Sequence, residues 1–278
     1  MTDDYASWIG RERREIDMLE VSRARAMQAT LGDEGAPLKA GDGLPPLWHW
    51  LYFWEVAAAR TLGYDGHPER GDFLPPLPLK RRMWAGSRVS FPAPLPLGGA
   101  ARRRSKILKV ELKQGRSGAL GFVTVAHEIA AEGRGGGGEE PDTDSRAPPA
   151  PGERPRRGEP APPEARWRQV VEPDATLLFR YSALTFNGHR IHYDRRFCLE
   201  SEGYPGLVVH GPLLATLMVE LARREGRRSI FRFQFRALAP VFDTAPFQVC
   251  GQPTANGAAL WIADADNRLC MQGEVEWA

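Results

Sequence analysis

The segment His210–Arg224 reads HGPLLATLMVELARR, and between its polar ends almost every side chain is apolar. Such a run, followed by Gly226, predicts a helix that is amphipathic or buried in the core. Segments rich in β-forming residues come next and predict strands at Ser229–Ala237, Phe247–Gly251, Gly257–Ala263 and Arg268–Glu276. We therefore expect the second half of the chain to wrap a curved antiparallel sheet around one long helix.

The first half shows the same order of elements. Trp8–Ala29 has helical character, and Leu47–Leu62, LWHWLYFWEVAAARTL, is apolar almost all round, which predicts a core helix. Its aromatic residues are also compatible with a wall for a ligand. Strands are predicted at Arg82–Phe91, Ser105–Lys113 and Gly118–Ile129, and Ala175–Phe186 predicts a strand that opens the second half. The repeated order predicts an α+β fold, a double hotdog with two curved antiparallel sheets, each around a long core helix.

The stretch Gly133–Glu164 separates the two halves. It alternates glycine and proline with charged residues and contains no large apolar residue, so it cannot bury enough surface to offset its ordering entropy. The 278 residues are therefore expected to divide into an N-terminal hotdog at 1–132, a disordered linker at 133–164 and a C-terminal hotdog at 165–278.

The overall charge and the cysteines exclude several classes of protein. Lysine and arginine number 37 against 35 acidic residues, so a net charge of +2 gives no general attraction for nucleic acid or anionic membranes. No apolar run approaches the roughly 18 residues that span a bilayer, and the polar N-terminus is unlike a signal peptide. Three distant cysteines, Cys198, Cys250 and Cys270, fit buried packing better than a disulfide framework. We expect a cytoplasmic protein that binds neither nucleic acid nor membranes.

Chemically useful side chains gather between Asn187 and His210. Three of the six histidines of the chain fall in this stretch, and imidazole both takes and returns a proton near neutral pH. Gly211 then opens the predicted core helix, where free N–H groups and the helix dipole would stabilise a developing enolate oxygen. The stretch holds His189, Arg190, His192, Tyr193, Asp194 and His210.

The runs RYSALTFNGHRIHYD and GYPGLVVHGPL, at 180–194 and 203–213, resemble the MaoC-type hydratases. The resemblance is greater to the double-hotdog branch with an N-terminal FAS1-like dehydratase domain. That branch includes mesaconyl-C4-CoA hydratase, itaconyl-CoA hydratase and hydroxyacyl-thioester dehydratase type 2. It implies a lyase that adds water to an α,β-unsaturated acyl-CoA or removes it from a 3-hydroxyacyl-CoA. A short branched dicarboxylic acyl group is favoured, and the CoA thioester is a substrate, with no metal or redox cofactor.

The wider family carries the motif Asp-x-Asn-Pro-x-His and a later glycine N–H that polarises the thioester. On this resemblance His192 matches the catalytic histidine and Gly211 the N–H donor, whereas Asn187 stands at the aspartate position. An amide is no base at neutral pH. Either His192 is the base and Asn187 orients the water, or His189 shares the proton transfer. Gly211, His210 and Tyr193 are then expected to bind the substrate.

Other interpretations remain open at several positions. His189 and His192 have no carboxylate or cysteine at a metal-ligand spacing, so no metal is expected. His210 is equally well explained by a structural role, and Asp194 either orients an imidazole or caps the next turn. The basic runs Arg102–Lys109 and Arg223–Arg228 fit CoA phosphates or solvated surfaces.

The first half contains no counterpart of NGHRIH, so one site per chain is expected, with a non-catalytic N-terminal hotdog that supplies the substrate tunnel. A homodimer is compatible with this fold. A hotdog thioesterase and a non-catalytic acyl-CoA binding protein are the alternative functions.

Overall fold

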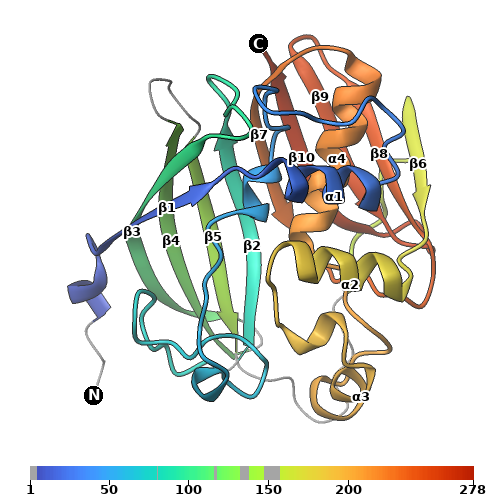
Figure 1. The fold of residues 1–278 in the computed structure, drawn as a ribbon. Helices are drawn as coiled ribbons and strands as arrows, with labels where there is room; N and C mark the ends of the chain where they lie inside the picture. The colour runs from blue at the N-terminus through green and yellow to red at the C-terminus, as the bar shows by residue number, and fades with distance from the viewer. Residues whose placement is uncertain (1–4, 80, 116–117, 132–137, 147–156) are drawn as a thin grey trace.

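The fold is an antiparallel sheet of ten strands that curves around a buried helix (Figure 1). A computed structural model describes residues 5–79, 81–115, 118–131, 138–146 and 157–278. The strand order is β1-β3-β4-β5-β2-β7-β10-β9-β8-β6, so the first five strands form one side of the sheet and the last five the other. Each half of the chain therefore builds its own half of the sheet.

The strands of the first half are β1 (Glu12–Met18), β2 (Arg81–Ser90), β3 (Ala100–Gly115), β4 (Gly118–Ala131) and β5 (Gly138–Arg146). Those of the second half are β6 (Trp167–Val171), β7 (Ile230–Ala237), β8 (Phe247–Pro253), β9 (Gly257–Ala263) and β10 (Leu269–Trp277). The predicted strands at 82–91, 105–113, 118–129, 229–237, 247–251, 257–263 and 268–276 are confirmed with small shifts at their ends.

The two halves join where β2 pairs with β7, from Gly86 opposite Arg236 to Ser90 opposite Arg232. A side chain at Gly86 would place its Cβ 2.4 Å from the Phe235 carbonyl oxygen, so glycine is required at this close approach. The part of β2 from Arg81 to Ala85 pairs with β5 but extends beyond the part that pairs with β7. This end points towards the loops that carry the clustered histidines.

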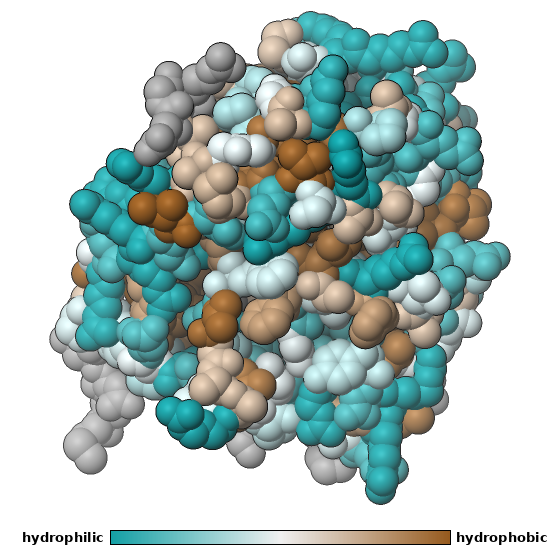
Figure 2. Space-filling model, in the orientation of Figure 1, coloured by the Kyte–Doolittle hydropathy of each residue, from teal (hydrophilic) through white to brown (hydrophobic). Residues whose placement is uncertain are grey.

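The long helix α4 (Gly211–Gly226) fills the second half and confirms the predicted core helix. Its side chains from Leu213 to Val219 are buried against the strands of that half. Gly226 ends the helix under the Trp277 ring, which a Cβ would meet at 2.5 Å, and Arg227 follows with a left-handed φ of 52°. Many large apolar side chains are buried, and the face in Figure 2 shows apolar residues in small groups among hydrophilic ones.

The predicted core helix at Leu47–Leu62 is wrong. Only the short 3-10 turns η2 (Trp48–Leu51) and η3 (Ala59–Thr61) form there, because Leu47 and Phe53 adopt positive φ and turn the chain. The aromatic residues still enter the core, and Trp48 Nε1 donates a hydrogen bond to Glu220 on α4 at 2.9 Å. The stretch is a compact aromatic loop that packs on α4.

The predicted helix at Trp8–Ala29 is only partly confirmed. Its first part forms the strand β1, and its second part forms α1 (Val21–Thr30), which packs against α2 of the second half. The first half thus has no long core helix of its own among its described residues. Its apolar side chains join the same core as those around α4.

The predicted strand at Ala175–Phe186 is also wrong, because the segment forms the helix α2 (Ala175–Leu184). Asp174 caps it by accepting a hydrogen bond from the Leu177 N–H at 2.7 Å. Leu178, Tyr181 and Ser182 are its buried residues, at helical spacing. The other short elements are η1 (Tyr5–Trp8), η4 (Arg190–His192), α3 (Arg195–Phe197) and the π-helical turn η5 (Cys198–Glu202).

The linker predicted at 133–164 is interrupted by a strand. Residues 138–146 form β5, which pairs with β2 and β4, since main-chain hydrogen bonds to two neighbours need no apolar side chains. Pro160 forms a bridge with Arg268, so this end of the stretch lies against the second half. Residues 133–137 and 147–156 lie outside the described residues. None of the described helices has the length and apolar character needed to cross a membrane.

Candidate active site

The loop after α2 brings the first predicted site residues together. Phe186 takes a left-handed φ of 51° and reverses the chain, and the Asn187 side-chain oxygen accepts a hydrogen bond from the His189 N–H at 2.9 Å. The Asn187 N–H donates to the Ser182 carbonyl at 2.8 Å. Asn187 therefore shapes the turn that presents His189, and its side-chain oxygen accepts one hydrogen bond in doing so.

His192 is held in one tautomer by the main chain. Its Nδ1 lies 2.7 Å from the Val208 carbonyl oxygen, which only accepts hydrogen bonds, so Nδ1 carries the proton. The Nε2 atom of the neutral ring is then the nitrogen with a free electron pair. His192 is accordingly prepared to accept a proton at Nε2.

His210 lies behind His192 and supports it. The two rings stack with centroids 3.6 Å apart, and His210 Nε2 is 2.8 Å from the Ser182 hydroxyl on α2. His210 is 0% exposed, so it has no direct access to a substrate in this conformation. The next residue, Gly211, begins α4, and its N–H therefore lies at the positive end of the helix dipole.

The first half of the chain also contributes to this cluster. The His67 ring lies edge-on to His189 with centroids 4.3 Å apart, and Asp65 is buried beside it. The Asp65 carbonyl accepts a hydrogen bond from the Arg190 N–H at 2.8 Å, which ties the two loops together. The expectation that the first half only supplies a tunnel therefore missed these two side chains.

Sequence patterns gave little warning of His67 and Asp65. They lie in GYDGHPE, a loop with no metal or catalytic spacing of its own. The one signal is Gly66, which follows Asp65. It has a φ of +87°, and a Cβ there would lie 2.1 Å from the Gly188 carbonyl oxygen. Two glycines in contact let the loops of both halves meet.

Burial disfavours the protonated form of the clustered histidines. Burial first, and the neighbouring cations and imidazoles second, lower the pKa of His67, His189 and His192 from 6.5 to about 3. The pKa of His210 is lowered well below its usual value for the same reason. All four rings are therefore neutral at physiological pH.

Asp65, His67 and His189 place possible metal ligands within 4.8 Å of one another. The sequence argument found no carboxylate at a metal-ligand spacing from His189 and His192, but Asp65 reaches His189 from the first half of the chain. Arg70 and Arg82 act on the same group, and their positive charge lowers the pKa of His67. Two guanidinium groups so close disfavour a divalent cation at this position.

The comparisons with known proteins agree with this geometry. Residues 47–243 match the family of hydroxyacyl-thioester dehydratases type 2. The chain belongs to this family. It is 45% identical to mesaconyl-C(4)-CoA hydratase of Chloroflexus aurantiacus over 273 residues, 98% of each chain. It is also 42% identical over 103 residues to the mitochondrial hydroxyacyl-thioester dehydratase type 2 of Schizosaccharomyces pombe, which covers 36% of this chain and 33% of that protein.

Solved structures support the fold of this dehydratase family member. A MaoC-like dehydratase from Phytophthora capsici aligns with a TM-score of 0.71 at 12% identity, over 97% of this chain and 96% of the other. A Mycobacterium tuberculosis protein with a double hotdog fold aligns with a TM-score of 0.62 at 13% identity, over 97% and 96%. The predicted α+β double hotdog is confirmed, and the family and its members confirm a hydratase or dehydratase.

The other predicted site residues have structural contacts in this family member. Tyr193 is 52% exposed, and its hydroxyl donates to the Gly188 carbonyl at 3.0 Å. Asp194 accepts a hydrogen bond from the Phe197 N–H at 2.9 Å and pairs with Arg190 at 2.8 Å, so it caps α3 and orients no imidazole. Both residues stabilise the loop that carries the histidines.

Several arginines of the two basic runs form ion pairs. On β3, Arg103 pairs with Glu15 and Arg104 with Glu12, both on β1. At the end of α4, Arg223 pairs with Glu220 at 2.8 Å. The three cysteines are all buried free thiols, as the packing interpretation predicted.

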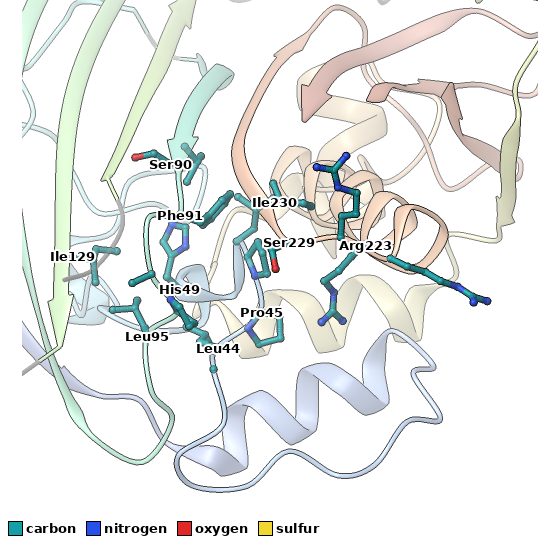
Figure 3. A pocket seen from close by; sticks show the side chains of 18 residues that line it. Leu44, Pro45, His49, Ser90, Phe91, Leu95, Ile129, Arg223, Ser229 and Ile230 are labelled. Carbon is teal, nitrogen blue, oxygen red and sulfur yellow. The ribbon is translucent and has the colours of Figure 1, made fainter. Parts of the chain in front are cut away.

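A separate pocket of about 480 Å³ lies where α4 ends (Figure 3). Leu44, Leu95 and Ile230 give it apolar walls, and Arg223 borders it from α4. Arg223 follows Gly211 by twelve positions on the same helix, roughly 18 Å at about 1.5 Å per residue. None of the four clustered histidines is among its described lining residues, so we do not assign the reaction to it.

Proposed function

We propose that this protein hydrates a short branched acyl-CoA that carries a second carboxylate, such as mesaconyl-C4-CoA, or catalyses the reverse dehydration. The observation that carries the proposal is the pair formed by His192 and the start of α4. His192 has its Nδ1 bound to the Val208 carbonyl, and its neighbour His210 directly precedes Gly211. This arrangement supports a base and an oxyanion donor that act on one substrate. The similarity to mesaconyl-C(4)-CoA hydratase over nearly the whole chain supports the acyl group.

In the proposed reaction His192 Nε2 removes a proton from water while the water oxygen bonds to the β-carbon. The electrons of the double bond move to the α-carbon and the thioester oxygen, which forms an enolate. The proton on His192 then passes to the α-carbon, so the product has gained one molecule of water. The sequence balances without a metal ion or redox group, and CoA enters only as part of the substrate.

Gly211 is proposed to hold the enolate oxygen through its N–H. Pro212 follows it and has no N–H, so few donors compete at this turn of α4. A Cβ built on Gly211 would meet only Met271 Cε, at 4.0 Å, so open space lies beside this glycine. A thioester in that space would meet the N–H and the positive end of the helix dipole.

His189 and His210 are proposed to position His192 from two sides. The His189 ring lies edge-on to His192 with centroids 5.4 Å apart. The His210 ring stacks on the His192 ring at an interplanar angle of 18°. His189 is also near enough to share the proton transfer, as one of the two alternatives for the missing aspartate requires. Asn187 acts through the loop it shapes, because its oxygen already accepts the His189 N–H.

The experiment follows the enoyl-thioester absorbance of mesaconyl-C4-, itaconyl- and crotonyl-CoA and measures free thiol in parallel. Loss of the band without thiol release is the expected result, with mesaconyl-C4-CoA preferred. His192→Ala should abolish it. His127→Ala is the matched control, since His127 lies on β4 beside Ser105 and away from the cluster. Thiol release would instead indicate a thioesterase, and tight binding without reaction would indicate a binding protein.

A further inference from the structure

Arg82 lies beside the histidine cluster in an unusual charge environment. It is on the end of β2 that β7 does not cover, and its Nη2 donates to the Pro68 carbonyl at 2.5 Å. Pro68 directly follows His67, so this bond holds the guanidinium against the histidine loop. Its charge acts on both His67 and His189 and lowers the pKa of each ring.

Among the side chains that the structure describes, no carboxylate lies within 4 Å of the Arg82 guanidinium. Asp65 and Glu55 act on it only from a greater distance, and burial lowers its pKa. Other partly buried arginines do have a close carboxylate, as in the pairs Arg23–Asp17, Arg103–Glu15 and Arg190–Asp194. A half-buried cation without a counter-ion is unfavourable unless a ligand supplies one.

Arg70 brings a second guanidinium group near His67. Its Nη1 donates to the carbonyls of Leu77 and Leu79, at 3.1 and 2.6 Å, and burial lowers its pKa as well. Asp65 is the buried carboxylate beside these two cations.

His67 offers a second polar contact at the same place. Its Nδ1 is buried and has no hydrogen-bond partner among the described residues. The Asp65 carboxylate is 3.7 Å from it, which is too long for a hydrogen bond. A neutral imidazole nitrogen and a guanidinium group together suit a carboxylate.

We propose that Arg82, with His67, binds the free carboxylate of the substrate and so selects acyl-CoA substrates that carry one. This inference rests on the proposed function. In mesaconyl-C4-CoA the free carboxylate is attached to the β-carbon, the atom that receives the water oxygen. A carboxylate held by Arg82 beside His189 would place that carbon next to His192.

The test compares mesaconyl-C4-CoA with 3-methylcrotonyl-CoA, in which a methyl group replaces the free carboxylate. Arg82→Met should lower kcat/KM for mesaconyl-C4-CoA on the order of 10- to 100-fold more than for 3-methylcrotonyl-CoA, as expected for the loss of a hydrogen-bonded charge. Arg82→Lys should show a smaller difference, because it keeps the charge but loses the two-pronged geometry. Arg103→Met, which breaks an ion pair away from the cluster, is the control and should show no difference between the substrates.

Binding of unreactive saturated analogues gives a second readout that does not depend on turnover. In calorimetry, Arg82→Met should weaken the binding of 3-methylsuccinyl-CoA much more than the binding of isovaleryl-CoA. An equal loss of affinity for both ligands, or no loss, would overturn the carboxylate site. The proposed function would still stand if the wild-type protein hydrates mesaconyl-C4-CoA. A wild-type protein that hydrates neither substrate would overturn both.

Discussion

The His67 ring, from the first half of the chain, lies edge-on to the His189 ring, from the second half, with centroids 4.3 Å apart. The two loops are fastened by the bond from the Arg190 N–H to the Asp65 carbonyl and by the contact of Gly66 with Gly188. The proposed active site is therefore built from both halves. Separation of the halves would take the histidine cluster apart.

Replacement of Gly66 by alanine should separate the loops. The new Cβ would lie 2.1 Å from the Gly188 carbonyl oxygen, on a residue with a φ of +87°. Gly10→Ala is a matched control, since Gly10 has the same φ and nothing within 4 Å. The control should lose roughly 1 kcal/mol of stability from backbone strain alone. Gly66→Ala should lose more stability than Gly10→Ala and should also lower kcat. Equal effects of the two variants in urea unfolding and in kinetics would contradict the account.

Gly211→Ala should separate activity from stability. The Cβ would make only an ordinary contact with Met271 at 4.0 Å, so the melting temperature should stay the same or rise. The methyl group would occupy the space proposed for the thioester, and kcat/KM should fall about 100-fold, as when an oxyanion donor is lost. Steady-state kinetics with a thermal melt measures both. Full activity would show that the thioester does not bind beside Gly211.

Ser182 should matter through His210. The Ser182→Ala variant would remove the hydrogen bond to His210 Nε2, and the Nδ1 atom of this ring is already buried without a partner among the described residues. A loss of about 1–3 kcal/mol in the free energy of unfolding is expected for a buried polar group left unpaired. A smaller fall in kcat should accompany it, because His192 loses the fixed ring on which it stacks. Ser87→Ala, buried on β2, is a control that should leave kcat unchanged.

Activity should be nearly independent of pH between pH 5 and 8. The bases are neutral throughout this range, since burial lowers the pKa of His189 and His192 to about 3. A fall in kcat/KM centred near pH 6.5 would instead indicate an imidazole with an ordinary pKa.

Stability should depend on pH even where activity does not. The unfolded chain binds protons on these histidines below about pH 6.5, and the folded protein does so only near pH 3. Their contribution to stability is therefore complete above pH 6.5 and is lost as the pH falls towards 3, by about 1.4 kcal/mol for each buried histidine at one unit below its unfolded pKa. Urea unfolding at pH 7.5 and 5.5 measures this, and replacing His192 by glutamine should reduce the difference.

The sequence predicted those parts of the fold that have one strong local pattern. The long apolar run that became α4 and the strands β7 to β10 were found because the run is apolar over several helical turns and the strands are rich in β-forming residues. Ala175–Leu184 was misread, since its apolar residues fit both periods and the cap at Asp174 was overlooked. The helix predicted at Leu47–Leu62 was wrong for another reason, because aromatic side chains enter a core from a loop as well as from a helix.

The candidate site was predicted in part. His189, His192 and His210 lie close in sequence and are close in space. His67 and Asp65 could not be found in this way, since more than one hundred positions separate them from His189 and only the tertiary contact of two glycine loops brings them together. The Asn187 role in shaping the turn depends on backbone geometry that the motif does not encode.

The most direct test of hydration at the histidine cluster is the reaction of mesaconyl-C4-CoA in water labelled with ¹⁸O, with the product analysed by mass spectrometry. The account predicts one labelled oxygen in a hydroxyl group on the β-carbon of an intact thioester, formed by the wild-type protein and by His127→Ala but not by His192→Ala. Label in a newly released carboxylate, or labelled hydroxyl from His192→Ala at the wild-type rate, would contradict it.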